Sequence, residues 1–188
     1  VTCGQFLDVH VQHEPIADPQ HALLAAARVV EYKTAKYTVQ RPTQFGALLA
    51  GGSAELLAGL EAYGSALGRA FQFRDDLLGV FGDEGATGKP AGDDLREGKR
   101  TVLVAHAYAG TTPAGRALLE RDLGQAEMDT EQIAALREVI VASGAPQLVE
   151  AMITEGFEGA LAALDAPMTD AGRTALTVLA QAATVRAT

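Results

Sequence analysis

Residues 71–79, which read FQFRDDLLG, decide how this sequence folds, because they combine large apolar side chains with two adjacent acids. On a helix that turns about 100° per residue, Gln72, Asp75, Asp76 and Gly79 fall on one side. We therefore expect the acids at the wall of a helical bundle. The apolar stripe that borders them at helical spacing consists of Leu60, Tyr63, Leu67, Phe71 and Leu78.

The adjacent acids Asp75 and Asp76 suit a hard divalent cation. Magnesium prefers carboxylate and phosphate oxygens and usually takes only one or two side chains from a protein. Such an ion also removes the repulsion between acids and a bound diphosphate, while lysines supply further positive charge. A bare Asp-Asp pair is more often a solvated helix end, so the surrounding sequence has to decide.

Two lysine-bearing segments follow the acids. Residues 82–92, GDEGATGKPAG, form a glycine-rich loop in which the backbone and Lys89 can approach a ligand closely. Residues 92–101, GDDLREGKRT, carry Lys99. Both segments resemble a nucleotide-binding phosphate loop only in part, because the residues around each Gly-Lys pair do not match that motif.

An earlier lysine, Lys33, lies in the segment YKTA at residues 32–35. A lysine in an alanine-rich helix is usually solvated. Val29, Val30 and Tyr37 bracket Lys33 at helical spacing, however, so its ammonium group could reach inward from an apolar surface.

These elements together resemble the trans-polyprenyl diphosphate synthases, the family of the geranylgeranyl and farnesyl diphosphate synthases. Residues 71–101 resemble the second aspartate-rich region of that family. GQFLD at residues 4–8 resembles its Gly-Gln-x-x-Asp element, residues 32–35 resemble its Lys-Thr element, and the continuation at residues 36–42 is similar to actinobacterial members. Four elements in the family order are more specific than any one of them.

The resemblance implies a role for each matching residue. Lys33 and Lys89 would hold the allylic diphosphate, and Lys99 and Asp94 would order the loop or assist in binding phosphate. Gln72 and Thr34 would line the cavity near the allylic carbon. Gly68 and Ser65, on the same side of the helix as Gln72, are expected to keep that cavity open. The resemblance thus implies four catalytic residues, Lys33, Thr34, Gln72 and Lys89, and three that bind the substrate diphosphate, Lys33, Lys89 and Lys99.

By the same resemblance, Asp75 and Asp76 would bind magnesium. The family region is commonly Asp-Asp-x-x-Asp, and here Gly79 stands at the last position. Asp83, one helical turn further on, is a further candidate for the third carboxylate.

The resemblance implies a magnesium-dependent prenyltransferase that condenses an allylic prenyl diphosphate with isopentenyl diphosphate, with geranylgeranyl diphosphate as the expected product and a homodimer as the expected assembly. Two alternatives remain open: a non-catalytic partner subunit of a prenyl synthase, and a class I terpene cyclase. Lys33-Thr34 and the Gly-Lys-Pro loop at residues 88–90 favour a synthase over a cyclase. The intact acids and lysines favour a catalyst over a passive subunit.

The family carries a first Asp-Asp-x-x-Asp element before its Gly-Gln-x-x-Asp element, whereas here Gly-Gln begins at Gly4. We therefore expect residues 1–188 to be the C-terminal part of a single synthase domain. Half of the magnesium site and the isopentenyl diphosphate site would then be missing, so we expect this portion alone to be inactive.

Composition indicates an all-α bundle, and the resemblance implies that this bundle is of the isoprenoid synthase type and incomplete as given. Alanine and leucine dominate a chain that is 48% hydrophobic, and no alternating strand pattern of useful length occurs. A formal charge of −9 argues against nucleic-acid binding. The single cysteine, Cys3, suits a reducing compartment and hence a cytoplasmic location, and no run approaches the ~20 apolar residues of a membrane span.

Capping and breaking residues predict the helix boundaries. Asp18-Pro19 should begin a helix that runs to residue 39, where Arg41-Pro42 should stop it. A short helix at residues 44–50 should be separated by Gly-Gly-Ser from a long one that ends near Phe81. Later helices are expected over residues 100–109, from Thr130 to near Gly144, from Pro146 to about Leu164, and from Thr169 or Asp170 onward.

Overall fold

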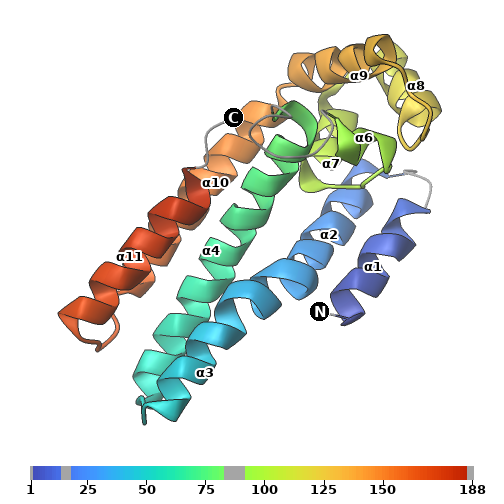
Figure 1. Ribbon diagram of the computed structural model, residues 1–188. Helices are drawn as coiled ribbons and strands as arrows, with labels where there is room; N and C mark the ends of the chain where they lie inside the picture. Colours follow the sequence, from blue (N-terminus) through green and yellow to red (C-terminus); the bar gives the residue numbers. More distant parts are fainter. Residues whose placement is uncertain (1, 14–17, 83–91, 186–188) are drawn as a thin grey trace. The chain divides into compact units, whose positions relative to one another are not determined.

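The computed structural model describes residues 2–13, 18–82 and 92–185, and within these ranges it contains helices and no strand (Figure 1). The all-α prediction is therefore confirmed. The predicted site residues Asp83 and Lys89, and the Gly-Lys-Pro loop with them, lie outside the described residues. The helices are α1 (Thr2–Gln12), α2 (Pro19–Val29), the π-helix η1 (Val30–Gln40), α3 (Arg41–Leu49), α4 (Ala54–Phe81), α6 (Asp93–Arg96), α7 (Val102–Gly110), α8 (Pro113–Asp122), α9 (Thr130–Ala142), α10 (Ala145–Ala163) and α11 (Asp170–Thr184).

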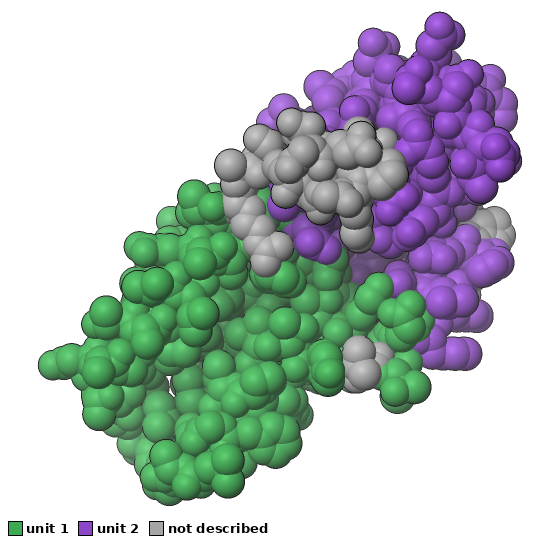
Figure 2. Space-filling view, in the orientation of Figure 1, with its two compact units in different colours: residues 1–5, 29–74, 151–187 green, residues 6–28, 75–150, 188 purple. Residues whose placement is uncertain are grey.

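The chain divides into two compact units, which Figure 2 shows in green and purple. Unit 1 comprises residues 1–5, 29–74 and 151–187, and unit 2 comprises residues 6–28, 75–150 and 188. The long helix α4 contributes to both, because its residues up to Arg74 belong to unit 1 and those from Asp75 belong to unit 2.

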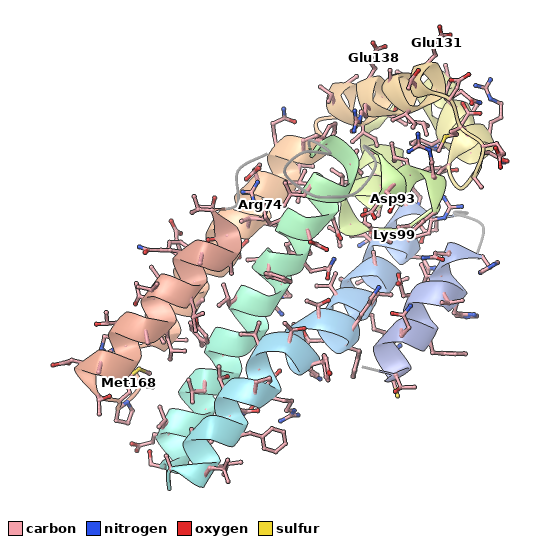
Figure 3. All side chains as sticks on the ribbon, in the orientation of Figure 1. Arg74, Asp93, Lys99, Glu131, Glu138 and Met168 are labelled. Carbon is pink, nitrogen blue, oxygen red and sulfur yellow. The ribbon has the colours of Figure 1, made fainter. Side chains whose placement is uncertain are left out.

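Unit 1 is a bundle in which η1, α10 and α11 pack on α4. Gly68 of α4 lies so close to Ala35 of η1 that a Cβ atom at position 68 would overlap the Ala35 backbone. The Tyr63 hydroxyl donates to the carbonyl oxygen of Leu176 at 2.7 Å. Arg74, which Figure 3 labels, donates from Nε to the carbonyl oxygen of Thr184 at 2.9 Å, so α11 is held at two points. The core cluster contains Tyr63, Leu67, Ala160, Leu164 and Ala180.

Unit 2 is built around α7, whose sequence VLVAHAYAG is apolar on nearly every side. Such a helix is stable only when it is surrounded, and α7 contacts both α8 and α9. Arg137 of α9 donates from Nε to the carbonyl oxygen of Val80 at 2.7 Å, which attaches α9 to the last turns of α4. The end of α4 is therefore fixed by an arginine that caps one of its carbonyl groups.

The predicted stop at Arg41-Pro42 is wrong, because the chain stays helical through both residues. The α-helix changes at Val30 into a π-helix, and the backbone N–H of Arg41 donates to the carbonyl of Lys36, five residues earlier. Pro42 then occupies the first turn of α3, where a missing N–H is tolerated. Thr43 donates its hydroxyl to the carbonyl oxygens of Val39 and Gln40, at 2.9 and 3.0 Å, and so satisfies groups at the junction.

The other boundaries agree with the prediction to within a few residues. Asp18 caps α2 by accepting from the backbone of Gln20 at 3.0 Å, and Thr169 caps α11. The predicted cap Thr130 is wrong by one residue, since Asp129 is the N-cap of α9. The prediction also missed the helices α6 and α8, although Thr112-Pro113 is an N-cap and first-turn proline of the kind that marked α2.

Candidate active site

The predicted metal ligands lie on consecutive residues near the end of α4. Asp75 is exposed, whereas Asp76 is only 4% exposed. Gln72 stands on the preceding turn of the same helix and is half-buried. The sequence thus predicted correctly that these three residues share a helix at the edge of a core.

The Lys-Thr element lies in the π-helix η1. Lys33 is half-buried and Thr34 is buried, and the Thr34 hydroxyl donates to Oε1 of Gln72 at 2.5 Å. This bond joins two predicted site residues that are 38 positions apart in the chain. Gly4 contacts the backbone of Lys33, so the Gly-Gln element at the start of α1 packs on the Lys-Thr element.

The cavity expected beside Gly68 is not found there, because the Ala35 backbone fills that space. Apolar cavities of about 730 and 420 Å³ lie elsewhere among the described residues of unit 1, and both are lined in part by Pro42 and Thr43. The larger extends to Met168 in the turn between α10 and α11, which Figure 3 labels. The smaller is lined by Phe71, one turn before Asp75 on α4.

A second cluster of charged residues surrounds the end of α4 within unit 2. The carboxylate of Asp94, in α6, lies directly against Gly79, where a Cβ atom would overlap it. Lys99 donates to Oδ1 of Asp94 and forms an ion pair with Oε2 of Glu97 at 3.2 Å. Figure 3 labels Lys99 beside Asp93, the first residue of α6. The ammonium group of Lys99 is thus held between two carboxylates.

Burial and hydrogen bonding both shift the pKa values of Asp94 and Lys99, and the two effects can be separated. Burial raises the pKa of Asp94, although the hydrogen bond from Lys99 opposes that effect, and the nearby charges of Asp75 and Glu97 raise the pKa further. Burial would lower the pKa of Lys99, but its hydrogen bonds with Asp94 and Glu97 outweigh this and raise it. The raised pKa of Lys99 means that its ammonium group stays protonated and charged beside Asp94.

The donors on α4 fit magnesium by their chemistry. Two carboxylates, one exposed and one buried, match an ion that takes one or two protein ligands and keeps several waters. No group of three His, Cys, Asp or Glu residues among those described is arranged to hold a metal ion.

The structure brings together some predicted site residues. Thr34 joins Gln72 within unit 1, and the acids lie near the end of α4 in unit 2 with Lys99 bound to Asp94. The resemblance implied only a supporting role for Asp94, and the missing side chain at position 79 is the one sequence signal for its contact with Gly79. The assignment of Lys33, Lys89 and Lys99 to a diphosphate stays a prediction.

Comparison with known proteins places the chain in a family. Residues 1–140 match the model of the polyprenyl synthetase family, and the chain belongs to that family. It is 34% identical over 149 residues to a short chain isoprenyl diphosphate synthase of Methanothermobacter thermautotrophicus, an alignment that covers 79% of this chain and 45% of that protein. It is 33% identical over 161 residues to a geranylgeranyl diphosphate synthase of Mycobacterium tuberculosis, with 86% of this chain and 45% of that protein covered.

Solved structures agree in fold. The crystal structure of a geranylgeranyl pyrophosphate synthase from Corynebacterium glutamicum, complexed with isoprenyl diphosphate and magnesium, superposes with a TM-score of 0.90 at 43% identity. The superposition covers 100% of this chain and 52% of that one. The all-α isoprenoid synthase fold is thereby confirmed, and the chain spans about half the length of the relatives that it matches.

Among the described residues, no helix is both long enough and apolar enough to pass through a lipid bilayer. The cytoplasmic location predicted from the sequence stays a prediction.

Proposed function

We propose that this chain is the C-terminal part of a prenyl diphosphate synthase, which condenses an allylic prenyl diphosphate with isopentenyl diphosphate and releases diphosphate. Membership of the polyprenyl synthetase family and the names of the relatives support this proposal. The observation that carries it is the hydrogen bond from Thr34 to Gln72, because it joins the Lys-Thr element to the helix that bears Asp75 and Asp76. Geranylgeranyl diphosphate is the proposed product, and a homodimer is the proposed assembly.

In this proposal Asp75 and Asp76 hold magnesium, which would neutralise the negative charge that builds on the departing diphosphate. Lys33, and Lys89 with it, would bind the phosphate oxygens as cationic hydrogen-bond donors. Departure of the diphosphate leaves an allylic cation, which the double bond of isopentenyl diphosphate attacks, and a proton is then lost to the released diphosphate.

Thr34 and Gln72, the polar pair proposed to lie beside the reacting carbon, would stabilise the cation. Thr34 donates its proton to Gln72, so the oxygen lone pairs of its hydroxyl are the groups it can present to a positive charge. Because these dipoles are fixed by the hydrogen bond before the reaction, they need no reorganisation when charge develops. Thr34 is buried, and burial of this part of the site would keep out water, which would otherwise trap the cation as an alcohol.

The test is prenyl transfer by the full-length protein, measured with labelled isopentenyl diphosphate and allylic diphosphates of increasing length. Asp75→Ala should lower turnover by about 100-fold or more while circular dichroism stays unchanged, because charge stabilisation at the diphosphate is lost. Glu131→Ala, which removes an exposed acid of α9, is the matched control and should keep turnover (Figure 3).

Three results would contradict the proposal in different ways. Wild-type turnover in Asp75→Ala would remove Asp75 from the mechanism. A cyclised hydrocarbon product would indicate a terpene cyclase. Turnover that requires a second, different protein would indicate a non-catalytic partner subunit.

A further inference from the structure

The contact between Gly79 and Asp94 is the feature of the charged cluster that the proposed function leaves unexplained. Position 79 follows Asp75 by four residues on α4, so both lie on the same side of that helix. Gly79 has no side chain, and the space a side chain would take is filled by the carboxylate of Asp94 from α6. A carboxylate therefore occupies this place on the helix, although it comes from another part of the chain.

The environment of Asp94 is costly for a residue that serves folding alone. Asp94 is 7% exposed, and Asp75 is near enough to repel it electrostatically. Lys99 compensates the charge by direct pairing. Buried ion pairs often add little net stability compared with apolar residues of similar volume, so the arrangement calls for a role beyond packing.

We propose that Asp94 is a positioning residue for the metal site of the synthase, a role that rests on the proposed function. Its carboxylate replaces a side chain at position 79, and Lys99 fixes its orientation. Magnesium keeps several of its waters in protein sites, and Asp94 acts on the ion by orienting one of these waters.

The first test measures binding and not turnover. Magnesium is titrated calorimetrically into the full-length protein in the presence of inorganic diphosphate. Asp94→Asn keeps the shape of the side chain and removes its charge, and it should weaken magnesium binding by about tenfold or more, as loss of an outer-shell partner does. Glu97→Gln is the matched control, because it removes the other, more exposed partner of Lys99, and it should change the affinity by less than about twofold.

A pair of variants tests the exchange between the two positions. Gly79→Asp alone should disturb the end of α4, because the new side chain and Asp94 need the same space. Gly79→Asp combined with Asp94→Gly should restore magnesium affinity to within about threefold of the wild type. If Asp94→Asn loses its helical circular dichroism signal, the double variant decides, since recovered affinity supports the proposal and lost affinity overturns it.

Two outcomes would overturn this inference. One is magnesium binding by a folded Asp94→Asn protein that equals the wild type, and the other is a double variant no better than Gly79→Asp alone. Failure of the proposed function would give a different result. The wild-type protein would then make no prenyl product, and this would hold for any outcome of the magnesium titrations with the variants at positions 79 and 94.

Discussion

Thr34 donates its hydroxyl proton to the side-chain oxygen of Gln72 at 2.5 Å, and this bond ties the π-helix η1 to α4 beside the proposed reaction centre. Thr34 is buried, so removing its hydroxyl would cost free energy of unfolding in two ways. The hydrogen bond would be lost, and the side-chain oxygen of Gln72 would lose its partner. Packing of the Gly68 face on Ala35 keeps the two helices close enough for this bond to form.

Thr34→Val should lower the free energy of unfolding of the protein by about 1–2 kcal/mol, because it replaces the hydroxyl by a methyl group of similar size. Urea-induced unfolding followed by circular dichroism measures this difference. Thr34→Ser keeps the donor and removes only a methyl group, so it should retain more of the stability and of the prenyl transfer than Thr34→Val. Equal stability of wild type and Thr34→Val would show that the bond contributes nothing.

The close approach of η1 and α4 predicts that Gly68 cannot be enlarged. Gly68→Ala should destabilise the protein by about 1–3 kcal/mol, because the added methyl group meets the backbone of Ala35. Gly159, an exposed helical glycine of α10 whose Cβ would meet only the side chain of Ala66 at 3.7 Å, is the matched control. Gly159→Ala should raise the thermal midpoint, since alanine favours helix by up to about 1 kcal/mol over glycine. The same sign of change at both sites would contradict this packing argument.

The fold class and most helices could be predicted from the sequence because their signals are local. Asp18-Pro19 specifies a helix start by itself, and the spacing of Gln72, Asp75 and Asp76 follows from helix geometry. The π-helix could not be predicted in this way. In this segment the backbone N–H of Arg41 donates to the carbonyl of Lys36, five residues earlier, and Pro42 falls in the first turn of α3, where its missing N–H is tolerated.

The candidate site was predictable only in part for a related reason. The acids and the Lys-Thr element form short motifs, whereas the contact of Asp94 with Gly79 joins residues from different helices and has no sequence pattern of its own. Likewise, the small residue Gly68 was expected to keep a cavity open. Gly68 instead allows close contact between α4 and Ala35 of η1, and the sequence alone does not show which residue will face it.

The start of α9 gives a prediction that separates two adjacent residues. Asp129 accepts from the backbone of Gln132 at 2.8 Å, and the Gln132 side chain accepts from the backbone of Asp129 at 3.0 Å. Asp129→Ala should therefore cost about 1 kcal/mol of stability. Thr130→Ala, one residue further on, should change stability by only a few tenths of that amount, since Thr130 lies inside the helix. Equal losses in thermal unfolding experiments would contradict Asp129 as the cap.

The buried tyrosine of the unit 1 core predicts a loss of stability at alkaline pH. Tyr63 is 1% exposed and donates its phenolic proton to Leu176, and burial raises its pKa from 10.0 to about 12. In the unfolded chain the phenol loses its proton near pH 10, whereas the folded protein retains it. Stability from this group is therefore complete below pH 10 and should fall by roughly 1–2 kcal/mol as the pH rises toward 12.

Urea unfolding at pH 8 to 12 measures this fall. Tyr63→Phe should be less stable than the wild type at pH 8, because the bond to Leu176 is lost, and its stability should then decline less steeply above pH 10. Tyr37→Phe alters an exposed tyrosine and should leave the wild-type slope unchanged, so any difference between the two variants isolates the buried phenol. Identical slopes for wild type and Tyr63→Phe would mean that Tyr63 ionises alike in the folded and unfolded chains, and would contradict its burial as the cause.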